Sequence, residues 1–223
     1  VEPVLENVGI ILPRDGYLSK VREICTKHDV LLIFDEVKTG LTSSYFGAQG
    51  LYGVRADITC LAKSIGGGFP IGALGGEEDV MRVFEKGCVH HGTYNSNPLV
   101  LAATKATLSV CSKEALEETY ARNKEFTGTV RALLENIRAQ APTFVAQVGC
   151  KGSVTFSNTQ PARYEDWKNS DMVLAELSWL WSTNRGVLTP PGLDEQWLVS
   201  LAHDEESLSI YLEQLQDLVT VLS

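Results

Sequence analysis

Residues 31–40, LLIFDEVKTG, and residues 58–76, ITCLAKSIGGGFPIGALGG, decide the fold that this sequence predicts. The apolar runs at 30–34, 58–62 and 71–74 are too short for helices and contain β-branched residues, which favours buried strands. A helical apolar pattern over residues 16–28 precedes the first run. This alternation predicts an α/β fold with a mostly parallel sheet and helices on both faces.

The rest of the chain shows helical and strand periodicity in a different order. Asn97-Pro98 combines a cap residue with proline at the first helical position, so a helix is expected from there to about residue 110. We expect further helices over 116–137, over 166–184 and at the C-terminal end, and strands at 144–148, 153–156 and 197–202. The pattern predicts two domains, residues 1–110 as the C-terminal portion of a large domain and 111–223 as a small α+β domain.

Composition excludes several classes of function. The chain of 223 residues has 19 Lys and Arg against 28 Asp and Glu, a formal net charge of -9. A binder of nucleic-acid phosphates needs a basic face, which such a chain does not supply. Its apolar runs are only a few residues long, far below the roughly 18 residues that span a bilayer. We therefore expect neither a nucleic acid nor a membrane as partner.

The cysteines and histidines predict no metal site. Five cysteines, an odd number, lack the Cys-x-x-Cys spacing, and no two of the four histidines stand four residues apart. Reduced thiols of this kind are typical of a cytoplasmic compartment.

Asp35 and Lys63 are the residues that point to chemistry. Asp35-Glu36 follows one expected strand and Lys63 follows the next, directly before Ser64 and a run of three glycines. Ligand sites of parallel α/β sheets lie at the carboxyl ends of the strands. A lysine between a buried strand and a glycine loop is poorly hydrated, which favours its neutral, nucleophilic form.

An aspartate and a lysine at neighbouring strand ends suit a pyridoxal phosphate site. The lysine amine can form a Schiff base with the aldehyde, and the aspartate can pair with the protonated pyridine nitrogen. Val37 shares a side of the strand with Asp35 and could lie against the ring face.

Residues 90–98, HHGTYNSNP, form the next motif. Thr93 offers a hydroxyl and a backbone N–H, and Gly92 lets the chain bend around an anion such as a phosphate. A capped helix entry is the other interpretation of this motif. Apolar residues followed by Asp-Glu are also found in the Walker B element of nucleotide hydrolases. The Lys63-Ser64 pair is preceded by Ala62 and not by the glycine of a phosphate-binding loop, so this alternative needs a loop upstream of residue 1.

Together, LLIFDEVKTG, LAKSIGGGFPIGALGG and HGTYNSNP resemble the class III aminotransferases, and most of all their glutamate-1-semialdehyde aminomutase-like branch. The resemblance implies the type I fold of pyridoxal-phosphate enzymes. It also implies that Asp35 binds the pyridine nitrogen, Val37 packs behind the ring and Lys63 is the Schiff-base lysine. Thr93 resembles the threonine that reaches the cofactor phosphate of the neighbouring subunit, which implies a homodimer with shared active sites.

The implied function is transfer of an amino group between an amino acid or amine and a carbonyl acceptor, both small molecules. Aminomutase, racemase or decarboxylase chemistry on the same cofactor stays open, as does a non-catalytic fragment. Members of the family are longer, and Glu2-Pro3 resembles the end of an earlier strand, so we expect an N-terminal part to be missing. Many relatives have an arginine soon after the Thr-Gly that matches Thr39-Gly40, whereas residues 41–44 here read Leu-Thr-Ser-Ser.

Overall fold

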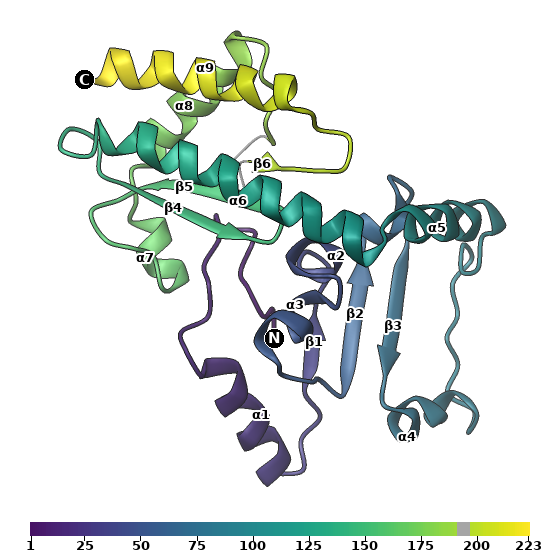
Figure 1. Cartoon of the computed structure of the whole chain (residues 1–223). Coiled ribbons are helices and arrows are strands. Elements are labelled where there is room, and N and C mark those ends of the chain that lie inside the picture. Colours follow the sequence, from purple (N-terminus) through teal and green to yellow (C-terminus); the bar gives the residue numbers. More distant parts are fainter. Residues whose placement is uncertain (191–196) are drawn as a thin grey trace. The chain divides into compact units, whose positions relative to one another are not determined.

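The computed structural model describes residues 1–190 and 197–223. The chain divides into two compact units (Figure 1). The first unit contains residues 1–3 and 13–116, and the second contains residues 4–12 and 117–223. The predicted division between residues 110 and 111 concerns the domains of the whole protein and stays a prediction.

A three-stranded sheet forms the centre of the first unit. Its strands are β1 (Ile33–Asp35), β2 (Ile58–Ala62) and β3 (Gly72–Gly76), in the order β1-β2-β3. β1 and β2 are parallel, as predicted, with Asp35 opposite Cys60. β3 runs antiparallel to β2, because the short connection through the glycine turn reverses the chain, whereas a parallel return needs a crossover of a dozen or more residues.

Helices cover one face of this sheet. Phe34 is fully buried in a cluster with Leu18, Leu32, Val54 and Ala56, whereas its neighbour Ile33 is 43% exposed. Successive side chains of a strand point to opposite faces, so β1 has a covered face and an open face. The helical segments of this unit are α1 (Tyr17–Lys27), α2 (Gly40–Ser43), α3 (Gly47–Tyr52), η1 (Lys63–Gly66), α4 (Glu78–Met81), η2 (Arg82–Phe84) and α5 (Pro98–Val110).

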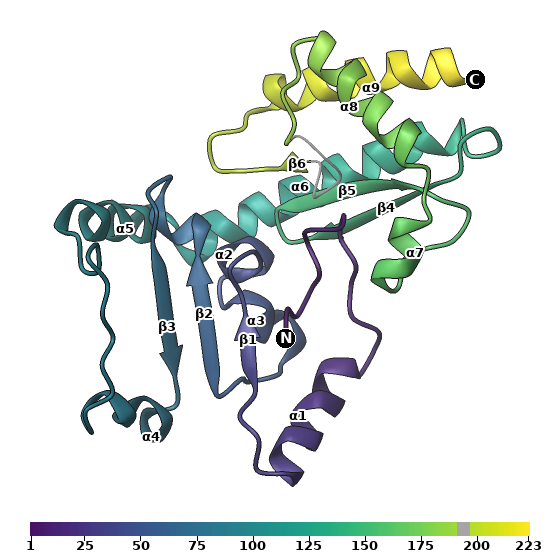
Figure 2. The ribbon, with the colours of Figure 1, turned by 180° about the vertical axis from the view of Figure 1, so that it is seen from behind.

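The second unit combines an antiparallel sheet with long helices. Its strands are β4 (Thr143–Val148), β5 (Lys151–Phe156) and β6 (Trp197–Leu198), and its helices are α6 (Lys113–Glu135), whose first turn lies in the first unit, α7 (Tyr164–Lys168), α8 (Met172–Asn184) and α9 (Glu205–Leu222). Figure 2 shows these elements from behind. Apolar side chains of α6, α8 and α9 share one core with β5 and β6. The small α+β arrangement expected for this part of the chain is therefore present.

Two expected elements differ from the structure. The predicted helix over 166–184 is two helices, α7 and α8, because Asp171 caps the start of α8 by accepting a hydrogen bond from the Leu174 N–H at 2.8 Å. The predicted strand over 197–202 is shorter in the structure, where the strand covers Trp197–Leu198. Among the helices that the structure describes, each is too short or too polar to cross a lipid bilayer.

Candidate active site

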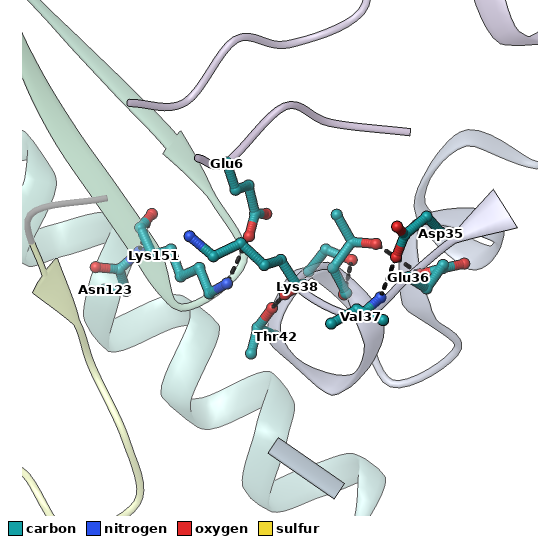
Figure 3. A network of polar contacts seen from close by, with 10 residues as sticks. Glu6, Asp35, Glu36, Val37, Lys38, Thr42, Asn123 and Lys151 are labelled. Carbon is teal, nitrogen blue, oxygen red and sulfur yellow. Dashed lines mark hydrogen bonds and ion pairs between the residues drawn. The ribbon is translucent and has the colours of Figure 1, made fainter. Parts of the chain in front are cut away.

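Asp35 ends β1 on the open face of the first sheet. Its side chain is exposed, and Oδ1 accepts a hydrogen bond from the backbone N–H of Val37 at 3.1 Å (Figure 3). No cation pairs with this carboxylate within the part of the chain that the structure describes. Asp35 can therefore accept a hydrogen bond from a bound molecule.

Lys63 directly follows β2 and begins η1. Because β1 and β2 are parallel and Asp35 lies opposite Cys60, the structure brings Lys63 and Asp35 to the same edge of the sheet. The Lys63 side chain is exposed and its backbone has a φ of 49°, in the left-handed region that a lysine rarely adopts. Strained backbone of this kind is found most often at functional sites.

The glycines after Lys63 serve different purposes. Gly67 has a φ of 56°, and a Cβ there would collide with the Thr107 hydroxyl of α5. Gly68 has a φ of 93° and open space where a Cβ would be. Close packing of α5 therefore needs a glycine at 67, whereas Gly68 leaves the surface beside Lys63 uncovered.

Val37 and Thr93 differ in their relation to this edge. Val37 is half-buried in the turn after β1 and contacts Asp35 through its N–H. Thr93 is exposed in the turn that precedes α5, and no hydrogen bond between described residues joins it to Asp35 or Lys63. The structure therefore places Asp35, Val37 and Lys63 at or directly after the carboxyl ends of β1 and β2, and Thr93 in the turn before α5.

Glu36 is a buried carboxylate for which the sequence predicted no role. It is 1% exposed and accepts hydrogen bonds from the Thr39 hydroxyl at 3.0 Å and from the N–H groups of Ala48 at 2.6 Å and Gln49 at 3.1 Å. Successive side chains of a strand point to opposite faces, so Glu36 points away from Asp35. This alternation is the sequence signal that could have placed Glu36 on the covered face.

The residues after Thr39-Gly40 bond within their own turn. The Thr42 hydroxyl donates to the Lys38 carbonyl and the Ser43 hydroxyl donates to the Thr39 carbonyl, each at 2.5 Å. Both hydroxyls are thus bonded back to the chain of their own helix. This turn contributes no cation for a substrate carboxylate.

The edge of the sheet therefore combines an amine, a carboxylate and an open glycine turn. An exposed lysine amine can bond to a carbonyl carbon, and a carboxylate can hold a proton on a heterocyclic nitrogen.

Comparison with known proteins assigns the chain to a family. Residues 1–185 match the model of the class III aminotransferases. The chain is 41% identical over 210 residues to a glutamate-1-semialdehyde 2,1-aminomutase of Methanocorpusculum labreanum, covering 93% of this chain and 50% of that protein. It is 36% identical over 225 residues to the enzyme of that name from Aquifex aeolicus, covering 100% of this chain and 53% of that protein. The chain spans about half the length of the curated relatives it matches.

Solved structures share its fold. The β-phenylalanine aminotransferase of Variovorax paradoxus superimposes with a TM-score of 0.91 at 28% identity, covering 99% of this chain and 51% of that one. A glutamate-1-semialdehyde aminomutase of Pseudomonas aeruginosa, solved in complex with PMP, has a TM-score of 0.89 at 27% identity, covering 100% of this chain and 51% of that one. These similarities confirm the predicted type I transaminase fold. The chain belongs to the class III aminotransferase family.

Proposed function

We propose that the protein containing this chain uses pyridoxal 5'-phosphate to transfer an amino group between an amino acid or amine and a carbonyl acceptor. The observation that carries the proposal is the position of Asp35 and Lys63 at the carboxyl ends of two adjacent parallel strands. Because the chain spans about half the length of its relatives, the proposal concerns the whole protein.

The side chains at this edge fit the cofactor. Asp35 is an exposed carboxylate without a cationic partner in the described residues, which suits a protonated ring nitrogen. Lys63 is exposed beside a turn whose Gly68 leaves room for a flat ring. When bound, pyridoxal phosphate would accept the electron pair that a substrate carbon releases.

Each residue then has a role that follows from its chemistry. Lys63 would hold the cofactor covalently through Nζ and, once released, move a proton at that nitrogen. Asp35 would keep the ring nitrogen protonated, and Val37 would pack against the ring. These three residues stand at or directly after the carboxyl ends of β1 and β2.

Thr93 fits a shared site in a homodimer. We assign its hydroxyl to the cofactor phosphate of the neighbouring subunit, as the resemblance of residues 91–98 to the class III aminotransferases implies. Two apolar residues of α5, Leu99 and Val110, are 63% and 61% exposed, which supports burial of this helix against a second subunit. A structure of the dimer in which Thr93 is far from the cofactor sites of both subunits would contradict this assignment.

Aminomutase chemistry is a second candidate. The observation that favours it is the 41% identity to an enzyme named as a glutamate-1-semialdehyde 2,1-aminomutase. An aminomutase moves the amino group within one carbon skeleton, whereas a transferase needs a separate acceptor.

A binding experiment tests the proposal at Lys63. We expect the full-length protein to develop a visible absorption band with pyridoxal phosphate, and borohydride to remove the band and leave the cofactor on the peptide that contains Lys63. Lys63→Ala should lose both signals, and Lys20→Ala, at an exposed lysine of α1, should keep them. Labelling that persists in Lys63→Ala would contradict the assignment.

An isotope experiment separates the candidate reactions. An ¹⁵N-labelled amino donor and an unlabelled keto acid are incubated together with the protein, and the products are analysed by mass spectrometry. A transferase places the label on the keto acid, whereas an aminomutase converts its substrate without an acceptor and keeps the label in the same skeleton. Loss of carbon dioxide or of stereochemistry alone would instead indicate decarboxylase or racemase activity.

We also propose a cytoplasmic location. The five cysteines, at positions 25, 60, 88, 111 and 150, are all free thiols, which suits a reducing compartment.

A further inference from the structure

We propose that Glu36 is a positioning residue that fixes the direction of the Asp35 carboxylate. This inference rests on the proposed function, because it assigns Asp35 to the ring nitrogen of the cofactor. Asp35 and Glu36 are neighbours whose side chains point to opposite faces of the sheet. What holds Glu36 therefore also holds the peptide from which Asp35 projects.

The Glu36 carboxylate is bound by three donors from later in the chain. Oε2 accepts from the Thr39 hydroxyl and the Ala48 N–H, and Oε1 accepts from the Gln49 N–H. A Cβ at Gly47 would collide with this carboxylate, so the chain approaches Glu36 as closely as only a glycine allows. The side chain thus ties the end of β1 to the start of α3.

The backbone of Glu36 is bound as well. Its N–H donates to the Cys60 carbonyl of β2 at 2.9 Å, and its carbonyl accepts from the Gly40 N–H at 2.9 Å. Cys60 lies opposite Asp35 and three residues before Lys63. The same peptide that follows Asp35 is therefore attached to the strand that leads to Lys63.

Gln49 extends this network to β2. Its side-chain amide donates to the Thr59 hydroxyl at 2.8 Å and its amide oxygen accepts from the Ala56 N–H at 2.8 Å. Glu36 and Gln49 together connect β1, α3 and β2 beneath the open face. This network on the covered face therefore supports the backbone that carries Asp35 on the open face.

Loss of the Glu36 charge would disturb this support. A glutamine has the same size, but its amide nitrogen donates and cannot accept. The Ala48 and Gln49 N–H groups bond to different oxygens of Glu36, so one of these two buried donors loses its partner. We expect the turn to shift to recover a hydrogen bond and to rotate the adjacent Asp35 carboxylate.

The test compares two cofactors in the full-length protein. Pyridoxal phosphate and its 1-deaza analogue differ only in the ring nitrogen that Asp35 would bind, so the ratio of their dissociation constants measures the Asp35 contact. Glu36→Gln should lower this preference by about tenfold, the size of one weakened charge-assisted hydrogen bond. The matched exchange Glu23→Gln, at an exposed position of α1, should leave the preference unchanged.

Two further variants complete the test. Asp35→Asn/Glu36→Gln should show the same ratio as Asp35→Asn alone, because Glu36 acts through Asp35. If Glu36→Gln does not fold, Thr39→Val removes one donor and should lower the preference by a smaller factor.

The outcomes separate the inference from the proposed function. An unchanged preference in a folded Glu36→Gln or Thr39→Val protein would overturn the positioning role and leave Glu36 as a structural residue. Equal preference in the wild type and in Asp35→Asn would instead refute the role of Asp35 itself.

Discussion

The left-handed backbone of Lys63 predicts an unusual order of stability among its variants. At most positions glycine is less favourable than alanine by about 0.5–1 kcal/mol, because it loses more backbone entropy on folding. At a φ of 49° the order should reverse, because a residue with a Cβ is strained there. We therefore expect Lys63→Gly to be more stable than Lys63→Ala.

The magnitude follows from two opposing terms. A left-handed conformation costs an L-residue about 1.5 kcal/mol, and the entropy of glycine offsets about half of this. The difference between the two variants should be about 0.7 kcal/mol in the free energy of unfolding, which moves a urea midpoint by about 0.3 M. The assay is urea unfolding of the full-length protein without cofactor, so that loss of the covalent link does not contribute.

Lys20 provides the control. It is 74% exposed within α1, where Lys20→Gly should be less stable than Lys20→Ala by about 1 kcal/mol. The glycine variant should therefore be the more stable one at position 63 and the less stable one at position 20. The reasoning is refuted if Lys63→Gly is equal to or less stable than Lys63→Ala while the control pair behaves as stated.

Three other predictions concern neighbouring parts of the molecule. Gly67→Ala should lower the free energy of unfolding more than Gly68→Ala, since both positions have positive φ but only the first would collide with α5; equal urea midpoints would argue against this packing. Burial raises the pKa of Asp57, but hydrogen bonds from Arg22 and the Leu32 N–H outweigh it and hold the pKa below its ordinary value. The resulting stability is present above about pH 4 and lost in more acidic solution. The stability difference between wild type and Asp57→Asn should consequently shrink as the pH falls below about 4, and a difference independent of pH would disprove it. Lys151→Met should cost about 3–5 kcal/mol because it removes one partner of a buried ion pair with Glu6 (Figure 3), and adding Glu6→Gln should restore much of this, as thermal unfolding of both variants can check.

Local sequence patterns were sufficient to predict several helices and strands. β2 has the bounds expected from the run 58–62, and α5 begins after the Asn97 cap, which accepts from the N–H groups of Leu99 and Val100. The helix expected over 16–28 is α1, whose Leu18 and Val21 pack in the core of the first unit. These signals depend on residues close in sequence.

Other features depend on contacts between distant residues. The buried environment of Glu36 comes from N–H groups twelve and thirteen positions later, which no local periodicity reveals. The antiparallel direction of β3 follows from the tight turn at Gly66–Gly68 and not from the composition of the strand. The positive φ of Lys63 could not be predicted from the sequence either, because lysine has no intrinsic preference for it.

The assignment of residues 4–12 to the second unit has a practical consequence for protein engineering. The polypeptide passes from one unit to the other after residues 3, 12 and 116. Truncation after residue 116 therefore keeps the whole first unit, but it also keeps residues 4–12 and removes them from the second unit. A proteolytic nick after residue 3 or 12 splits the chain into two fragments that no disulfide joins. Expression of the first unit alone would require excising a nine-residue insert and rejoining Pro3 to Pro13 with a designed linker.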